Sequence, residues 1–255
     1  MPQPAVFLAT ITTPITVIAV HGNGGGGFRF SMVADRMPKR IRFITPDLPG
    51  FGRAGRTTPL PSIRAYGEWL AEMVALTPGP RVVLGHGIGG AFVLEMLQHH
   101  AGLVRGAILH APVGVRLATR RFPALMKPQS MRWMVQHALA SPLLRPVWRR
   151  RFFRAPVPPR VERTFFSNYR HCAAFSSMFD MITPRWFESL SPVDVPAVLL
   201  WGGRERVLSS AHAEGYTAVL PRAGVVIEPD WDHFPMLDAP SAYAARIASL
   251  AHALA

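Results

Sequence analysis

Short runs of apolar, often β-branched residues alternate with amphipathic stretches along most of the chain. Six of these runs predict buried strands, over residues 15–20, 41–45, 81–85, 105–110, 197–201 and 224–228. Between them, apolar residues recur at helical spacing and predict helices over 28–36, 62–76, about 88–100, 210–219 and 241–254. Repeated strand–helix units imply an α/β fold with a mostly parallel, doubly wound sheet that helices cover on both faces.

The alternation of strands and helices stops at Val113 and resumes near Pro192. The segment between these residues shows no clear strand pattern and is rich in proline, arginine and aromatic residues. We therefore predict a core made of residues 1–112 and 191–255, into which an arginine-rich, helical segment of residues 113–190 is inserted.

The positive charge of the chain is concentrated in this insertion. Lys and Arg number 28 against 15 Asp and Glu, which gives a formal charge of +13. Residues 116–170 hold 13 of the basic residues and a single acidic one, Glu162, so the rest of the chain is nearly neutral. A nucleic-acid partner is therefore not expected. The local charge fits a solvated surface, an anionic or carrier-linked substrate, or contact with a membrane surface.

Composition narrows the class of protein further. Cys172 is the only cysteine, which excludes an internal disulfide and a cysteine-based zinc site. No apolar run reaches the roughly 18 residues of a membrane span, and Met1–Val20 lacks the basic start and the small-residue cleavage site of a signal peptide. No histidine motif typical of metal ligands is present. We expect a cytoplasmic protein that acts on a small molecule without a metal or another cofactor; its oligomeric state stays open.

Five motifs follow predicted strands in a fixed order. They are His21-Gly22 with its glycine-rich loop, DLPGFG at 47–52, GHGIGG at 85–90, GGRE at 202–205 and DWDHFPML at 230–237. The third matches the G-x-S-x-G nucleophile elbow except at its centre, where Gly87 replaces serine. Together the motifs make the chain resemble the α/β-hydrolase family over about residues 12–112 and 190–254. The resemblance makes the 113–190 insertion the counterpart of the family's variable helical lid.

The resemblance also implies roles for individual residues. His233 would be the general base, and Glu205, in place of the more common aspartate, would orient it. The backbone N–H groups of Asn23 and Ile88 would form the oxyanion hole. The remaining candidates for substrate contact are Gly24, His86 and His110. Because the chain begins only a few residues before its first core strand, we expect the family's first antiparallel strands to be reduced or missing.

Gly87 is the departure from the family pattern. Glycine has no side chain and cannot form an acyl-enzyme, so the usual serine mechanism is not expected. Three explanations stay open: a natural glycine in a protein with another activity, an engineered replacement of serine, or a different nucleophile such as Cys172 or Ser176. Glycine adopts the strained conformation of an elbow freely. The missing hydroxymethyl group leaves room for about one water molecule beside His233.

The sequence therefore predicts an esterase-like hydrolase with an altered triad, acting on a small carbonyl or ester substrate. In this hypothesis His233 and Glu205 form the base pair and no covalent nucleophile is present. Two alternatives remain. The protein could bind a ligand without chemistry, or it could be a cofactor-free lyase or cyclase in which His233 removes a proton from carbon. The retained base favours an enzyme over an inert scaffold.

Overall fold

Six parallel strands form one sheet, in the order β2-β1-β3-β4-β5-β6. The computed structural model describes residues 14–255. Its strands are β1 (Ile15–Val20), β2 (Ile41–Ile44), β3 (Arg81–His86), β4 (Gly106–His110), β5 (Ala197–Gly202) and β6 (Ala223–Glu228). Their limits agree with the sequence prediction to within one residue, and the predicted parallel, doubly wound sheet is confirmed.

The direction in which strands are added to the sheet reverses at β1. This strand pairs with β2 on one side and with β3 on the other; Ile15 lies opposite Ile41, and Val17 lies opposite Val82. In sheets of this kind the segments that follow the two central strands leave in opposite directions, and a crevice opens between them. The turns after β1 and β3 carry two of the sequence motifs, so the topology brings them together.

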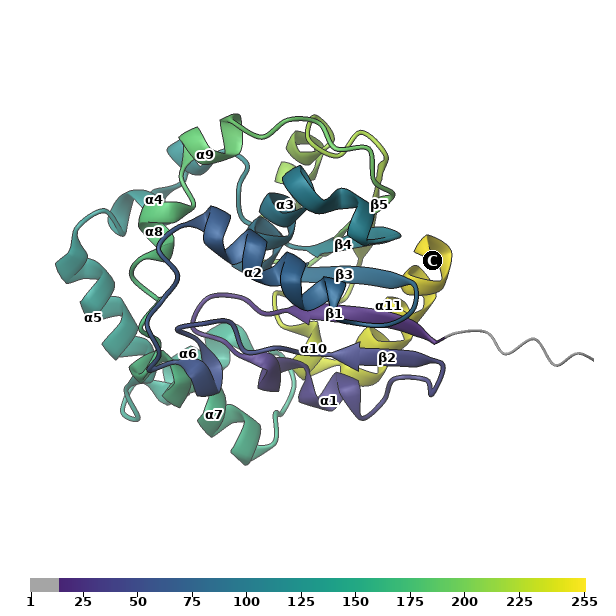
Figure 1. Cartoon of the computed structure of the whole chain (residues 1–255). Helices are drawn as coiled ribbons and strands as arrows, with labels where there is room; N and C mark the ends of the chain where they lie inside the picture. Colours follow the sequence, from purple (N-terminus) through teal and green to yellow (C-terminus); the bar gives the residue numbers. More distant parts are fainter. Residues whose placement is uncertain (1–13) are drawn as a thin grey trace, which may run out of the picture.

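Helices cover both faces of the sheet (Figure 1). One face carries α2 (Ile63–Ala75) and α3 (Ile88–His100), and the other carries α1 (Ser31–Ala34), α10 (Pro235–Asp238) and α11 (Pro240–Leu254). The start of α2 is fixed by Ser62, whose Oγ accepts a hydrogen bond from the Ala65 N–H at 3.1 Å. This cap was readable from the sequence because serine directly precedes the periodic apolar residues.

Two of the predicted helices are tighter than expected. The segment predicted over 28–36 is a 3-10 helix, η1 (Gly27–Phe30), followed by the short α1, and the segment predicted over 210–219 is the 3-10 helix η5 (Ser210–Tyr216). Over one or two turns, apolar spacing does not separate 3-10 from α-helical geometry. The other 3-10 turns are η2 (Gly52–Ala54), η3 (Ala101–Leu103) and η4 (Leu117–Thr119).

The segment between β4 and β5 is helical and lies at the end of the sheet where the strands finish (Figure 1). Its helices are α4 (Arg121–Leu125), α5 (Gln129–Ala140), α6 (Arg145–Phe152), α7 (Pro159–Arg170), α8 (Met178–Met181) and α9 (Pro184–Glu188). All of its residues are described, and none of them is in a strand. The division of the chain into a core and a separate lid domain stays a prediction.

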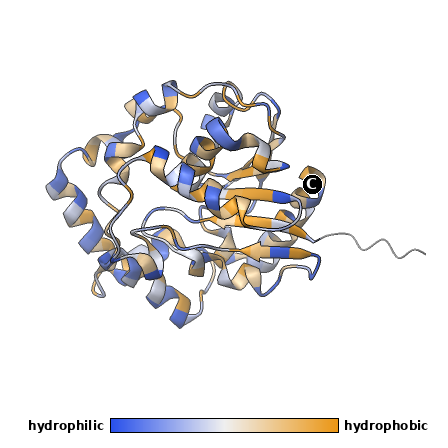
Figure 2. Cartoon of the chain, in the orientation of Figure 1, coloured by the Kyte–Doolittle hydropathy of each residue, from blue (hydrophilic) through white to orange (hydrophobic). Residues whose placement is uncertain are grey.

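The strands carry many of the most hydrophobic residues of the chain, as Figure 2 shows. Val17, Ile18, Val83, Leu84 and Ile108 are fully buried. Continuous apolar strands of this kind are typical of a parallel sheet between two helical layers. A close-packed sheet holds the loops at its ends in defined positions, and the candidate site is built from those loops.

No helix within residues 14–255 combines the length and hydrophobicity that a membrane crossing requires. Every strand in this part of the chain is parallel to its neighbours. The expectations of a missing signal peptide and of reduced antiparallel strands fall largely on residues 1–13, outside the part that the structure describes.

Candidate active site

The turn between β3 and α3 has the geometry of a nucleophile elbow. Gly87 occupies its tip with φ 58° and ψ −118°, a conformation that residues with a side chain adopt only under strain. A Cβ atom on Gly85 would lie 2.6 Å from the Gly89 carbonyl oxygen, so close packing of the turn requires glycine there. A Cβ atom on Gly87 would meet only the Cα of Gly22, at 3.7 Å. The tip therefore has room for a side chain, and the departure from the motif is confined to the position of the nucleophile.

His233 and Glu205 form a hydrogen-bonded pair. Nδ1 of His233 lies 2.9 Å from Oε2 of Glu205, and Oε1 of Glu205 accepts the backbone N–H groups of Val207 and Leu208 at 2.6 and 3.0 Å. A carboxylate can only accept, so Nδ1 of His233 donates and Nε2 of the neutral ring keeps its lone pair. Nε2 is thus the atom that can act as a general base.

Glu205 is ionised in this setting. Burial alone favours the neutral acid, but the charge and hydrogen bond of His233 and the N–H donors of Leu208 and Val207 outweigh burial and lower the pKa of Glu205 to about 2. The carboxylate is therefore present at neutral pH. It can orient the imidazole of His233 and stabilise the imidazolium that forms when His233 takes up a proton.

Asp232 fixes the loop that carries His233. Its side chain is 2 % exposed, and Oδ1 accepts the backbone N–H of His233 at 2.9 Å. Oδ2 accepts the guanidinium groups of Arg154, at 3.0 Å, and of Arg206. A buried carboxylate with two cationic partners is well compensated. The inserted segment, through Arg154, thereby helps to position the candidate base.

The two predicted oxyanion donors border one cavity together with Gly87 and His233. Ile88 is the first residue of α3, where backbone N–H groups have no partner within the helix. Neither its N–H nor that of Asn23 donates to another group within residues 14–255. Two unpaired N–H groups on one wall are what a developing oxyanion requires.

Arg29 supports the Asn23 loop and was missed by the sequence analysis. This buried side chain donates from Nη2 to the Asn23 carbonyl oxygen at 3.1 Å and to the Tyr169 hydroxyl at 3.2 Å. Its guanidinium carbon lies 4.6 Å from the ring centre of Phe165 and 5.3 Å from that of Phe234, within the range of cation–π attraction. The only signal in the sequence is its position shortly after the glycine-rich loop, which does not distinguish it from a solvated arginine.

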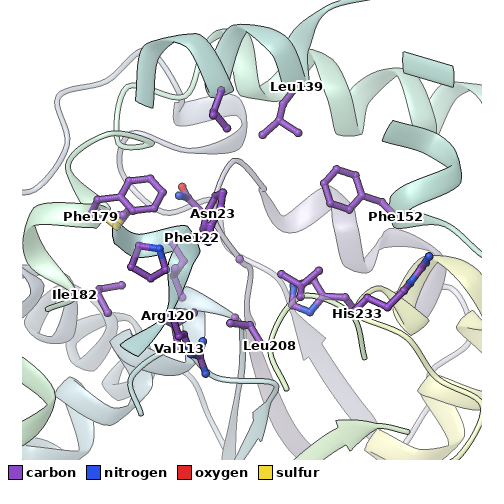
Figure 3. A pocket seen from close by; sticks show the side chains of 18 of the residues that line it. Asn23, Val113, Arg120, Phe122, Leu139, Phe152, Phe179, Ile182, Leu208 and His233 are labelled. Atoms are coloured by element: carbon purple, nitrogen blue, oxygen red, sulfur yellow. The ribbon is translucent and has the colours of Figure 1, made fainter. Parts of the chain in front are cut away.

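A cavity of about 610 Å³ joins these groups (Figure 3). Apolar side chains from the inserted segment form much of its wall, among them Leu139 on α5 and Phe152 on α6. Five arginines also border it: Arg29, Arg120, Arg121, Arg151 and Arg206. None of the described lining residues is Asp or Glu. The wall thus combines an apolar surface with an excess of positive charge.

His86 and His110 are buried beside the elbow, and their ring centres are 4.9 Å apart. Neither residue lines the cavity. Nε2 of His86 lies 3.0 Å from the His233 carbonyl oxygen, and Nδ1 of His110 lies 3.1 Å from the Tyr243 hydroxyl. Burial, reinforced by the nearby His233, lowers the pKa of His86 well below its usual value and that of His110 to about 3. Both rings are therefore neutral, and their predicted contact with substrate gains no support from this position.

The loop after β1 is held by Gly24 and His21. A Cβ atom on Gly24, where φ is 65°, would overlap the ring of Tyr169, so this residue packs against α7 and is not part of the cavity wall. Nε2 of His21 accepts the Leu48 N–H at 3.3 Å, and burial lowers the pKa of His21 to about 4. Both residues thus help to fix the loop that carries Asn23.

Neither of the replacement nucleophiles suggested by the sequence, Cys172 and Ser176, borders the cavity in the part of the chain that the structure describes. Cys172 lies outside the cavity wall, and burial raises the pKa of its thiol to about 12, which leaves no thiolate at neutral pH. Ser176 also lies outside the wall. Ser209 borders the cavity, but its Oγ accepts the Ala211 N–H at 3.3 Å at the start of η5. No group of three or more His, Cys, Asp or Glu within residues 14–255 could hold a metal ion.

The fold agrees with that of solved esterases. One is an esterase from Exiguobacterium antarcticum, with a TM-score of 0.70 and 16 % identity over 95 % of this chain and 93 % of that one. Another is a thermophilic esterase from Thermogutta terrifontis, with a TM-score of 0.68 and 19 % identity over 95 % and 91 % of the two chains. At these identities the likeness concerns the fold.

Comparison of sequences extends this agreement. The chain is 25 % identical over 240 residues to the pimeloyl-[acyl-carrier protein] methyl ester esterase of Aromatoleum aromaticum, a match that covers 88 % of this chain and 93 % of the relative. Residues 17–246 match the model of the alpha/beta hydrolase family. The parallel sheet, the elbow and this match over most of the chain lead to one conclusion: the protein belongs to the α/β-hydrolase family.

Proposed function

We propose that the protein hydrolyses small carboxylic esters and that a water molecule, rather than a side chain, attacks the substrate. The observation that carries this proposal is the combination of an intact base pair, His233 with Glu205, and an unfilled position at Gly87. The choice of an ester is supported by the relative from Aromatoleum aromaticum, a methyl ester esterase that matches most of the chain.

In the proposed reaction, Nε2 of His233 takes a proton from a water molecule beside Gly87 as the water oxygen bonds to the ester carbonyl carbon. The carbonyl oxygen becomes an oxyanion that accepts the N–H groups of Asn23 and Ile88. The imidazolium, stabilised by Glu205, then protonates the leaving alkoxide as the carbon–oxygen bond breaks. One water and one ester give one acid and one alcohol, and no acyl-enzyme forms.

The test compares the wild-type protein with His233→Gln on short p-nitrophenyl esters. We expect wild-type turnover without a burst of p-nitrophenol and without sensitivity to a fluorophosphonate, because no nucleophilic side chain is acylated. Removal of the base should lower kcat by about 100-fold or more. The matched control is His252→Gln, which makes the same change at an exposed histidine of α11 and should leave kcat unaltered.

Two results would contradict the proposal. Equal rates for wild type and His233→Gln would show that His233 is not the base. A wild-type protein that binds ester analogues yet hydrolyses none of the esters faster than buffer would instead be a ligand-binding member of the family.

A further inference from the structure

Arg120 is a cavity-lining cation without an ion-paired acidic residue among residues 14–255. It lies between η4 and α4. Figure 3 shows its side chain near Val113 and Leu208, on the side of the cavity away from Leu139. The Nε atom of Arg120 is buried and has no hydrogen-bond partner in the described part of the chain. A partly buried guanidinium that lacks both this hydrogen bond and an acidic partner is costly, and an anion bound in the cavity would offset its charge.

Glu205 does not neutralise this charge. Burial lowers the pKa of Arg120, and the carboxylate of Glu205 opposes that effect. Glu205 is therefore within electrostatic reach, but one of its oxygens is bonded to His233 and the other to two backbone N–H groups. An arginine stays protonated in a protein. Arg120 thus has no directly paired carboxylate among the described residues beside the cavity.

His212 extends the same cluster. Nη2 of Arg120 donates to Nδ1 of His212, which must therefore be unprotonated, and the proton of the neutral ring is on Nε2. Burial and the charges of Arg120 and Arg116 lower the pKa of His212, so the ring stays neutral at pH 7. His212 also borders the cavity. A cation and a neutral N–H donor side by side form a pair that an oxyanion group accepts from.

The surroundings restrict what such a ligand can be. Phe122, Phe179 and Ile182 border the same cavity as Arg120 and offer apolar contacts to the remainder of the ligand. Arg206 is already paired with Asp232 and is a weaker competitor for an anion. We propose that Arg120 and His212 form a subsite for an oxyanion group, carboxylate or phosphate, carried on an apolar chain. In turnover this subsite would hold the end of the substrate away from the ester, a role that rests on the proposed function, whereas its binding of an anion does not.

Unreactive ligands test the subsite by calorimetric titration. Hexanoate, hexyl phosphate and neutral hexanamide share an apolar chain and differ in the head group. We expect wild-type protein to bind at least one anion at least tenfold more tightly than hexanamide, and the tighter anion identifies the head group. Arg120→Gln should reduce this preference at least tenfold, while Arg120→Lys, which keeps the charge, should retain part of it.

The matched control is Arg150→Gln on α6. Arg150 is exposed and does not border the cavity, so this variant removes the same net charge from the inserted segment without touching the subsite. It should keep the preference for the anion within twofold. An equal loss in Arg150→Gln and Arg120→Gln would reduce the effect to general attraction and overturn the proposal.

The affinities of the wild-type protein for the three ligands also test the subsite, and this test does not depend on whether the variants fold. Equal affinity for all three ligands would overturn the subsite. A protein that prefers the anion but hydrolyses no ester would disprove the proposed function and leave the subsite standing.

Discussion

Nη2 of Arg29 lies 3.1 Å from the carbonyl oxygen of Asn23, and no acidic side chain in the described part of the chain pairs with this buried guanidinium. Burial of a charge is unfavourable, and here aromatic rings and two oxygen acceptors offset only part of that cost. The contact restrains the residue whose N–H is the proposed oxyanion donor. We interpret Arg29 as a positioning residue. Its buried charge lowers the stability of the fold, and its hydrogen bond holds Asn23 in place for the proposed reaction.

Arg29→Met tests this interpretation. Methionine fills a similar volume without a charge, so the melting temperature should stay level or rise. The Asn23 loop loses its tether, and kcat for a short ester should fall about tenfold with a smaller change in KM. The surface variant Arg150→Met should change neither quantity. A drop in melting temperature together with unchanged kcat would show that Arg29 is only structural.

Gly87→Ser should convert the site to a covalent mechanism. The open tip accepts a side chain, and the His233–Glu205 pair is in place to activate a hydroxyl. We expect a burst of p-nitrophenol equal to the enzyme concentration, labelling by a fluorophosphonate and a rise in kcat of at least tenfold. The control Gly87→Ala carries the same backbone strain, about 1–3 kcal/mol, without a hydroxyl. A folded Gly87→Ser that resists labelling would mean that the remaining residues do not work as a triad.

Glu205→Gln tests whether the charge of Glu205 is needed, because glutamine has nearly the same shape without the charge. Glutamine retains an acceptor oxygen for the N–H groups of Val207 and Leu208 but no longer stabilises an imidazolium at His233. We expect kcat to fall by about 100-fold or more with little change in KM. Glu162→Gln, the same substitution at a carboxylate on α7, is the control. Comparable kcat in wild type and Glu205→Gln would rule out this role.

The packing of the elbow predicts a difference between two glycines. Gly85→Ala places a methyl group 2.6 Å from the backbone oxygen of Gly89, so the free energy of unfolding should fall by about 2–3 kcal/mol. Gly102→Ala meets nothing within 4 Å and should change it by less than about 0.5 kcal/mol. Urea denaturation measures both variants. Equal stability of the two variants would show that β3 and α3 can move apart without lowering the free energy of unfolding.

The sequence predicts the features that depend on nearby residues and misses those that depend on contacts between distant segments. His233, Glu205 and Gly87 were predictable because each follows a strand, and the carboxyl ends of parallel strands meet at one edge of the sheet. Arg120 and Arg29 were not, because their burial depends on contacts with segments distant in the chain. Periodicity describes which face of an element is apolar, whereas it contains no information on which arginine of a basic segment turns inward.

Three buried histidines make the fold sensitive to acid. The pKa is lowered to about 4 for His21, well below its usual value for His86 and to about 3 for His110, in each case chiefly by burial. The unfolded chain takes up protons near the ordinary histidine pKa of about 6.5 while the folded protein does not, so stability is highest above that pH and falls as the pH drops toward 4. Between pH 7 and pH 5 the three histidines should lower the free energy of unfolding by about 5 kcal/mol.

Asp238 offsets part of this loss. Burial raises its pKa to about 6, so the folded protein takes up a proton there more readily than the unfolded chain and gains stability as the pH falls. Stability is measured by urea denaturation at pH 7 and at pH 5. The same midpoint and slope at the two pH values would contradict the neutral state of these histidines.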